Sequence, residues 1–169
     1  MYITQEQVQA LFIYQSLTGW LVNRTQRGRR GKIGERAGSF GADGYRCVQI
    51  GGQKFKEHRV IWLYIRGYMP DEIDHKDGNG YNNILTNLRE ATRSENIANS
   101  LREVGESGLR GVKFDPNTST WRARVSFGNC REYLGPFDTA EEAYEAYLVA
   151  AEIRHGEFAL HNRPTPNGE

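Results

Sequence analysis

The sequence predicts an α+β protein of two small domains, and three observations lead to that prediction. The chain has 169 residues, 38% of them hydrophobic and 25% charged, which suits short cores better than one large core. A strand–loop–strand–helix pattern, the ββα arrangement, occupies about 30 residues in the middle of the chain. Three short strand patterns and one amphipathic helix follow it. We therefore expect N-terminal β-hairpins with a ββα element, and then a three-stranded antiparallel sheet with one packed α-helix.

The first part of the chain contains two hairpin patterns and one helix pattern. In each hairpin pattern two β-prone runs flank a turn with glycine, and the second turn is Gly51-Gly52, a pair that tolerates φ > 0. Gly67 and Pro70 follow the helix pattern and are typical of a helix end. The expected strands are 11–14, 20–22, 45–50 and 53–56, and the expected helix is 58–66.

Residues 24–44, here called the basic arm, separate the two hairpins and are rich in Gly and Arg. Residues 1–70 carry 11 Lys or Arg against 4 Asp or Glu, although the net charge of the whole chain is only +1. Basic side chains that neutralise DNA phosphates release counterions and so add affinity. We expect the arm to follow a phosphate backbone; the alternative is a flexible solubilising loop. The arm residues expected to bind DNA are Arg27, Arg29, Arg30 and Lys32.

The ββα pattern begins with a strand at 73–75, passes through a turn-rich loop and returns in a strand at 88–91. Thr92 with Glu95 three residues later forms a capping box, which predicts that a helix starts there. The expected apolar stripe of this helix consists of Ile97, Leu101 and Val104.

Four polar side chains of this pattern indicate chemistry on a phosphodiester. Asp74 offers an anionic oxygen and Asn96, in the first turn of the helix, offers an amide oxygen; such oxygens hold Mg²⁺ or Mn²⁺. The imidazole of His75 titrates near neutral pH and suits a general base that activates water. Asn87 can tie the loop to the strand and fix the imidazole. An ordinary polar turn is the alternative interpretation of the same residues.

The order and spacing of these motifs resemble those of phage HNH endonucleases, most closely the homing endonucleases encoded in bacteriophage introns or standing free in phage genomes. The matching segments are 58–60, 74–79, 82–83, 87–89, Thr92 and 95–97. The resemblance implies a ββα-metal nuclease with His75 as the general base, oriented by Asn87. It also implies that Asp74 and Asn96 hold one divalent ion, that double-stranded DNA is the partner, and that the protein works in the cytoplasm of a bacterial host cell. The Cys-x-x-Cys pairs of other HNH branches are missing, so we expect no structural zinc.

The last third of the chain predicts a sheet backed by a helix. Strands at 110–114, 120–127 and 131–134 are separated by turns at Pro116-Asn117 and Gly128-Asn129. Thr139 with Glu142 forms a second capping box, and Gly156 closes the helix that follows. The apolar face of this helix consists of Ala140, Ala143, Tyr144, Tyr147, Leu148 and Ala151.

This region resembles an AP2 domain, through the segments 110–112, 121–125, 133–135 and 137–144. The resemblance implies that the three-stranded sheet lies in the major groove of DNA with the helix behind it. Arg122 and Arg124 alternate with Ala123 onto one face, and arginine can contact guanine edges or clamp phosphates. A solvated sheet face is the alternative. The residues expected to bind DNA are Arg110, Lys113, Arg122, Arg124, Arg131 and Tyr133.

The patterns predict a nuclease domain with its hairpins and basic arm at 1–104, a linker at 105–108, an AP2-like domain at 109–159 and a flexible tail at 160–169. The longest apolar run, 60–65, is far shorter than the roughly 20 residues of a membrane helix. We therefore expect no membrane association, and because no secretory leader pattern opens the sequence we expect no secretory signal. Cys47 and Cys130 do not have the spacing of a metal-binding pair.

We expect a metal-dependent, site-selective DNA endonuclease. One active site per chain favours nicking by a monomer, whereas double-strand cleavage needs a dimer or two successive events. Two other hypotheses stay open at this point. One is a DNA-binding regulator with an inactive nuclease fold, and the other is a structure-specific nuclease that acts on branched DNA or RNA.

Overall fold

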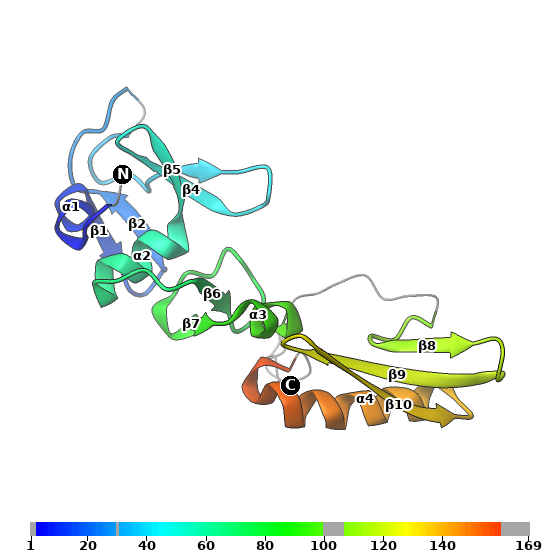
Figure 1. Cartoon of the computed structure of the whole chain (residues 1–169). Helices are drawn as coiled ribbons and strands as arrows, with labels where there is room; N and C mark the ends of the chain where they lie inside the picture. Colours follow the sequence, from blue (N-terminus) through cyan, green and yellow to red (C-terminus); the bar gives the residue numbers. More distant parts are fainter. Residues whose placement is uncertain (1–2, 30, 100–106, 160–169) are drawn as a thin grey trace. The chain divides into compact units, whose positions relative to one another are not determined.

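The computed structural model describes residues 3–29, 31–99 and 107–159, and the chain divides into two compact units (Figure 1). Unit 1 comprises residues 1–91 and unit 2 comprises residues 92–169. The division falls between the second strand and the helix of the expected ββα element. The strands of that element therefore belong to unit 1 and its helix to unit 2.

The described residues of unit 1 form two hairpins, one three-stranded sheet and two α-helices. The strand pairs β1–β2 and β6–β7 are both antiparallel, and the sheet has the order β3-β4-β5. The elements are α1 (Gln5–Leu11), β1 (Phe12–Gln15), β2 (Trp20–Asn23), β3 (Ser39–Phe40), β4 (Arg46–Ile50), β5 (Gln53–Lys56), α2 (Glu57–Arg66), β6 (Glu72–His75), the short 3-10 helix η1 (Leu85–Asn87) and β7 (Leu88–Ala91).

The expected hairpins and the expected helix are confirmed, and one further helix precedes them. Gly67 ends α2 in the left-handed conformation, with φ of 81°, as the sequence predicts. Helix α1 was not expected, because its seven residues carry only one buried side chain, Val8. Its start is nevertheless encoded locally, since Thr4 and Gln7 form a reciprocal capping box.

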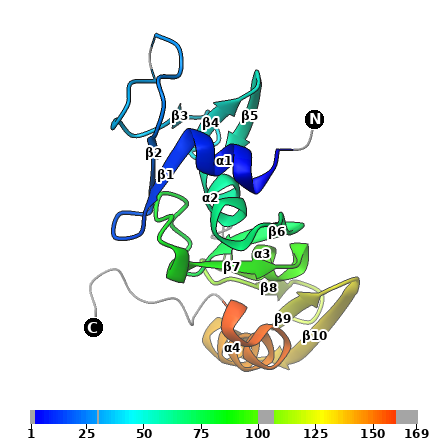
Figure 2. The same ribbon diagram turned by 90° about the vertical axis from the view of Figure 1, so that its left-hand side faces the viewer.

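Helix α2 forms the centre of the core of unit 1. It buries four consecutive apolar residues, from Val60 to Leu63, and α1 packs against it (Figure 2). Phe12 and Leu21, which are fully buried, bring the first hairpin into the same cluster. Apolar contacts on several sides of α2 therefore fix the position of this helix and of its first residue, Glu57.

The basic arm is partly built into unit 1, which differs from the loop without core residues that we expected. Ala37 is buried in the core cluster, and β3 pairs with β4. Isolated antiparallel bridges join Val22 to Arg36 and Arg27 to Gly31. The arm has no regular spacing of apolar residues, because backbone pairing rather than side-chain burial keeps most of it in place.

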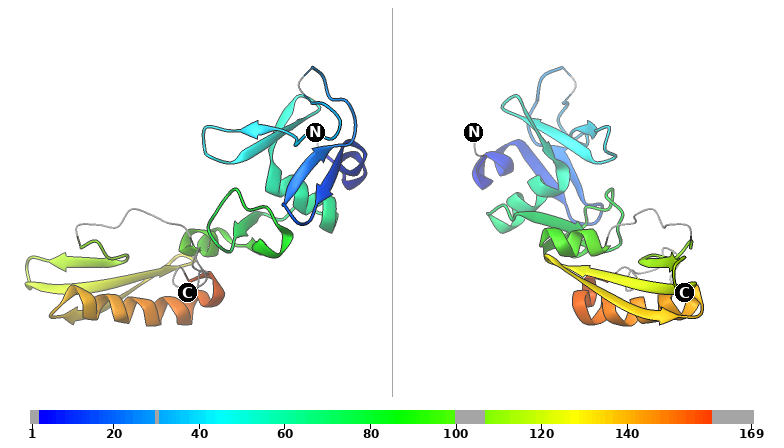
Figure 3. Two further views of the ribbon diagram at one scale, coloured as in Figure 1. Left: turned by 180° about the vertical axis from the view of Figure 1, so that it is seen from behind. Right: turned by 45° about the vertical axis from the view of Figure 1, so that its right-hand side comes forward.

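The described residues of unit 2 include a three-stranded antiparallel sheet with a long helix on one of its faces (Figure 3). The sheet order is β10-β9-β8, and Val112, Ala123 and Ala143 form the buried centre between sheet and helix. The expected strands and helix are confirmed. The elements are α3 (Arg93–Asn99), β8 (Val112–Asp115), β9 (Thr120–Phe127), β10 (Cys130–Phe137), α4 (Ala140–His155) and the 3-10 helix η2 (Gly156–Phe158).

Both predicted capping boxes of unit 2 are present. The Thr92 amide donates to Glu95 Oε2 at 2.7 Å, and the Glu95 amide donates to Thr92 Oγ1 at 3.3 Å. Thr139 and Glu142 make the equivalent pair before α4. Several expectations lie outside the described residues: Arg30, Leu101, Val104, part of the linker and the tail at 160–169. Among the residues that the structure does describe, none of the helices has the length and apolar character needed to cross a bilayer.

Gly19 links the fold of unit 1 to its site and gives a first prediction. It lies in the β1–β2 turn with φ of +70°, and a Cβ there would overlap the backbone of Asn83 and Ile84. We expect Gly19→Ala to lower the free energy of unfolding by about 2–4 kcal/mol. Urea unfolding followed by tryptophan fluorescence in a Trp121→Phe background measures this, because the remaining tryptophans report on unit 1.

Gly52→Ala is the matched control for Gly19→Ala. Its φ is +83°, but a Cβ would meet no atom within 4 Å, so only the backbone strain of about 1 kcal/mol applies. An equal loss of unfolding free energy in the two variants would show that a Cβ at position 19 does not clash with the backbone of residues 83–84.

Candidate active site

The β6–β7 hairpin carries the first two candidate residues. In its register Asp74 lies opposite Arg89 and His75 lies opposite Leu88. Successive residues of a strand point to opposite faces, so the side chains of Asp74 and His75 leave the strand on different sides. Each is only 4% exposed, which means that both polar groups need partners within the protein.

Arg89 is the partner of the Asp74 carboxylate. Its Nε and Nη2 atoms both donate to Asp74 Oδ2, at 2.8 Å each. Both side chains are at most 10% exposed, so this charge-assisted pair is little screened by water and fixes the orientation of the carboxylate.

Asn87 closes the loop between the two strands. Its Oδ1 accepts from the Asp77 amide at 3.1 Å, and its Nδ2 donates to Asp77 Oδ1 at 2.9 Å. The same Nδ2 donates to the Asn82 carbonyl oxygen at 2.8 Å, and Asn82 in turn donates to Asp77 Oδ2. These bonds tie the loop to the hairpin, as we expected of Asn87. A role of Asn87 toward the imidazole stays a prediction.

Asn83 is the residue that contacts the imidazole at Nε2. His75 Nε2 lies 2.9 Å from Asn83 Oδ1, and Asn83 Nδ2 donates to Glu57 Oε2 at 3.0 Å. Asn83 and Glu57 are 1% and 0% exposed. The sequence patterns did not mark either as a site residue. Asn83 was part of a matching segment without a role, and Glu57 lies 26 residues from its partner, so no local spacing could reveal the contact.

The buried carboxylate of Glu57 is held on both of its oxygens. Oε1 accepts from the Leu21 amide at 3.2 Å, and Oε2 accepts from Arg36 Nη2 at 2.9 Å as well as from Asn83. The Arg36 guanidinium also lies 4.5 Å from the centre of the Trp20 ring. These partners offset the lost hydration of a charge at the first residue of α2, where the helix dipole favours an anion.

His58 and Tyr45 are ring neighbours of His75. The ring centres of His58 and Tyr45 lie 5.0 Å and 6.1 Å from the centre of the His75 ring. Burial, helped by the neighbouring His75, lowers the pKa of His58 to about 3. Burial also lowers the pKa of His75, against the opposing effects of the Asn83 hydrogen bond and the nearby carboxylates of Asp77 and Asp74. At neutral pH both rings are uncharged, and a neutral imidazole is the form that accepts a proton.

The two expected metal ligands belong to different units. Asp74 lies in unit 1, and Asn96 is a half-buried residue of α3 in unit 2. The donor chemistry fits Mg²⁺ or Mn²⁺, because carboxylate and amide oxygens are both hard ligands. In residues 3–29, 31–99 and 107–159 no three His, Cys, Asp or Glu side chains gather as a metal site would require. An Asp–Asn pair would need water and phosphate oxygens to complete the shell.

The sheet of unit 2 presents on one face five of the six DNA contacts expected in the AP2-like region. Arg122 and Arg124 alternate with Ala123, which is buried toward α4, and directly opposite residues of antiparallel strands share a face. The register pairs Arg122 with Lys113, Arg124 with Tyr133 and Arg131 with Ser126. The basic sheet face therefore consists of Lys113, Arg122, Arg124, Arg131 and Tyr133, all of them exposed.

Arg110 differs from the other residues expected on that face. It precedes β8, and its Nη2 donates to the Ile97 carbonyl oxygen at 3.0 Å. Its guanidinium therefore helps to join α3 to the rest of unit 2.

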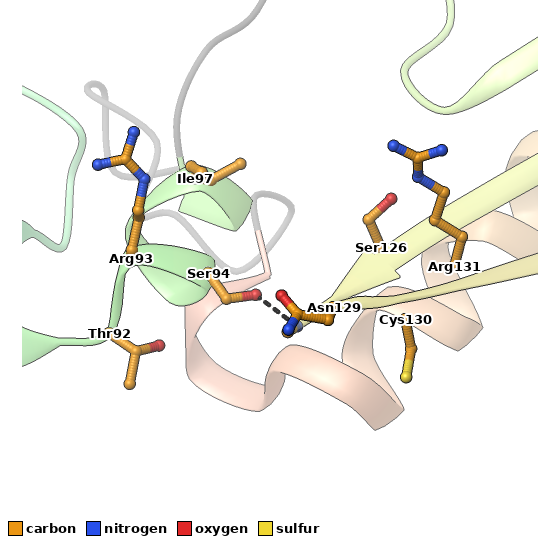
Figure 4. A pocket seen from close by; sticks show the side chains of 9 residues that line it. Thr92, Arg93, Ser94, Ile97, Ser126, Asn129, Cys130 and Arg131 are labelled. Carbon is orange, nitrogen blue, oxygen red and sulfur yellow. Dashed lines mark hydrogen bonds between the residues drawn. The ribbon is translucent and has the colours of Figure 1, made fainter.

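An open groove adjoins the basic sheet face between the start of α3 and the β9–β10 turn (Figure 4). Arg93 and Arg131 stand on opposite sides of it, and the Gly128 amide donates to Ser94 Oγ at 3.0 Å. The groove thus combines apolar surface with polar and basic groups, and the two arginines place positive charge on both of its sides. The lining residues are Thr92, Arg93, Ser94, Ile97, Ser126, Gly128, Asn129, Cys130 and Arg131.

The expected DNA contacts of the basic arm have different surroundings. The Arg27 guanidinium lies 4.5 Å from the centre of the Phe12 ring and donates to the Gln49 carbonyl oxygen, and burial lowers its pKa. Arg29 and Lys32 are exposed, with Lys32 Nζ 3.7 Å from a carboxylate oxygen of Glu35. Arg30 lies outside the described residues.

Comparison with known proteins agrees with the motif pattern. The family model described as HNH endonuclease matches residues 55–98, a range that includes both strands of the β6–β7 hairpin and the Glu57–Asn83 contact. The chain is 32% identical over 107 residues to Protein 3.8 of Escherichia phage T7, in an alignment that covers 62% of this chain and 88% of that protein. The chain belongs to the HNH endonuclease family.

Other similar proteins fall into two groups. An uncharacterized HNH endonuclease of Acanthamoeba polyphaga mimivirus is 33% identical over 113 residues, covering 65% of this HNH chain but only 58% of the mimivirus protein. An ethylene-responsive transcription factor of Arabidopsis thaliana is 34% identical over 112 residues, or 26% of its own length. The plant relatives also include AP2-like factors. A solved structure titled for DNA binding and cleavage by the HNH homing endonuclease I-HmuI shares 30% identity, covers 51% of this chain and 49% of that chain, and has a TM-score of 0.37.

The buried imidazole of His58 gives a prediction for the pH dependence of stability. Between pH 6.5 and about 3 the unfolded chain binds a proton at His58 that the folded chain does not. The free energy of unfolding should therefore be highest above pH 6.5 and fall on acidification, by about 1.4 kcal/mol per pH unit from this group. Urea unfolding of unit 1 at a series of pH values measures the slope. His58→Gln should flatten it, and an unchanged slope in that variant would contradict the prediction.

Proposed function

We propose that this HNH protein is a metal-dependent, site-selective DNA endonuclease of the phage homing type. The observation that carries the proposal is the buried, uncharged His75, held at the end of β6 next to an Arg-paired Asp74. A structural histidine has no need of an adjacent buried carboxylate, whereas hydrolysis of a phosphodiester uses a base beside a metal ligand.

In the proposed reaction the neutral imidazole of His75 accepts one proton from a water molecule. The water oxygen then forms a bond to phosphorus, and the bond from phosphorus to the 3′ oxygen breaks. Asp74 and Asn96 would hold one Mg²⁺ or Mn²⁺, whose charge, when bound, stabilises the negative charge on the phosphorane and on the leaving oxygen. Arg89 keeps the Asp74 carboxylate in position, and Asn87 keeps the loop closed.

Double-stranded DNA is the proposed substrate, and unit 2 is the proposed docking module. The basic sheet face offers exposed guanidinium groups of the kind that read guanine edges or clamp phosphates. Arg93 and Arg131 extend this surface into the adjoining groove, which would follow the phosphate backbone. The likeness to a phage T7 protein supports a role in the cytoplasm of a bacterial host cell. One proposed active site per chain favours a monomer that nicks one strand.

The proposed role of His75 as the general base in DNA cleavage can be tested directly. We expect the protein to nick supercoiled phage DNA in Mg²⁺ and to lose this activity in excess EDTA. His75→Ala should lower the rate by about 10²–10⁴, the usual contribution of a general base. Gel separation of nicked from supercoiled DNA measures the rate, and sequencing of the ends on phage genomic DNA identifies the target site.

His155→Ala is the matched control, because His155 lies at the end of α4 in unit 2. It should keep normal cleavage. Full activity of His75→Ala would refute the mechanism, and sequence-selective binding without cleavage in any divalent metal would favour a DNA-binding regulator. Preference for junction substrates over linear DNA would favour a structure-specific nuclease.

The docking role of the basic sheet face predicts a salt-dependent loss of affinity. We expect Arg124→Ala and Arg131→Ala each to weaken binding to a phage DNA duplex. Each should also reduce the slope of log K against log salt by about 0.9 for one lost phosphate contact. Fluorescence anisotropy at several salt concentrations measures both quantities.

Arg154→Ala removes the same charge from α4, where Arg154 Nε donates to Glu132 Oε2 at 3.0 Å. It should leave the salt slope unchanged. The docking assignment fails when the α4 variant and the sheet variants lose affinity equally.

A further inference from the structure

Four residues from separate segments of unit 1 form a continuous hydrogen-bonded chain that ends on His75. Arg36 comes from the basic arm, Glu57 from the start of α2, and Asn83 from the loop between β6 and β7. The successive distances are 2.9 Å from Arg36 Nη2 to Glu57 Oε2, 3.0 Å from Asn83 Nδ2 to Glu57 Oε2, and 2.9 Å from Asn83 Oδ1 to His75 Nε2.

The chain has a fixed direction because its first link is an ion pair. The Glu57 carboxylate, paired with the Arg36 guanidinium, can only accept hydrogen bonds. The Asn83 amide must therefore turn its NH₂ group toward Glu57, which places its carbonyl oxygen toward His75. A carbonyl oxygen can only accept, so His75 Nε2 must carry the proton. In a neutral imidazole the lone pair then lies on Nδ1.

We infer that Glu57 and Asn83 are positioning residues that hold His75 in the Nε2-protonated tautomer, so that Nδ1 is the atom that accepts the proton of the attacking water. The tautomer follows from the contacts within unit 1 alone. The role of Nδ1 in the reaction rests on the proposed function.

The opposite tautomer is disfavoured by two contacts at once. A lone pair on Nε2 would face the Asn83 oxygen at 2.9 Å, and relief by an amide flip would bring that oxygen against the Glu57 carboxylate at 3.0 Å. Either arrangement leaves two acceptors facing each other in a buried site, where such a mismatch costs more than it does in water. Glu57 itself is kept in place by the Leu21 amide and by Arg36.

The tautomer can be measured without any assay of cleavage. The whole protein is labelled with ¹⁵N-histidine and recorded by long-range ¹H–¹⁵N correlation at about pH 7.5, a pH at which an ordinary imidazole is mostly neutral. The spectrum of His75→Gln assigns the signals by their absence. We expect a pyrrole-type shift for Nε2 and a pyridine-type shift for Nδ1. The reverse pattern in the unmodified protein would overturn the inference, whatever the variants do.

Glu57→Gln tests whether the carboxylate sets the direction of the chain. A glutamine amide can present NH₂ to Asn83, which allows the Asn83 amide to flip, so we expect the His75 signals to move toward the Nδ1-protonated pattern. Glu35→Gln is the matched control, since Glu35 is an exposed carboxylate of the same unit. It should leave the His75 signals unchanged. Unchanged His75 signals in folded Glu57→Gln would remove Glu57 from the proposal.

A kinetic comparison separates this inference from the proposed function. In the nicking assay Glu57→Gln and Asn83→Ala should lower kcat by about tenfold or more with little change in KM, because they affect the base and not DNA docking. The expected tautomer in a protein that cleaves no DNA would leave the positioning chain standing and refute the nuclease proposal. A protein that cleaves DNA but shows the reverse tautomer would refute the positioning chain and leave the nuclease proposal standing.

Discussion

A fully buried carboxylate, that of Glu57, is the constraint on which the architecture of unit 1 depends. A charge without water is tolerated only when its hydrogen bonds are complete, so the segments that carry its partners must meet at the start of α2. The hydrogen bonds of Glu57 come from Leu21 in the first hairpin, Arg36 in the basic arm and Asn83 in the loop of the β6–β7 hairpin. Loss of any one of them leaves part of the charge unsatisfied, which couples the position of the loop to the folding of the whole unit.

The loop of the β6–β7 hairpin is held from two sides by different means. On one side Asn87 and Asp77 make a compact set of polar bonds that closes the loop on its own strands. On the other side Asn83 reaches into the core. His75 contacts Asn83, and Arg89 restrains the neighbouring Asp74. The backbone of this hairpin is short, so rigid placement of its polar groups comes from side-chain bonds rather than from sheet pairing.

The sequence predicted the elements well where local chemistry determines them. The capping boxes at Thr92 and Thr139 and the glycine ends of the helices each depend on residues a few positions apart. Helix α1 was missed because it is short and buries one residue, although its capping box is also local. The candidate site was predicted only in part. The motif pointed to Asp74 and His75. The contacts of Glu57, however, join residues up to 36 positions apart in the sequence, and no local spacing pattern predicts hydrogen bonds over such a separation.

Within residues 3–29, 31–99 and 107–159, one hydrophobic cluster surrounds α2 and another lies between α4 and its sheet. No buried residue of these ranges belongs to both clusters. The exposed arginines on the sheet of unit 2 therefore lie outside the packed cluster that includes Ile73 and Leu88 of the β6–β7 hairpin, and their mutation should leave that cluster intact. Substitutions on the exposed sheet face of unit 2 can therefore accumulate with little effect on the free energy of unfolding of unit 1, so the two units can diverge in sequence at different rates.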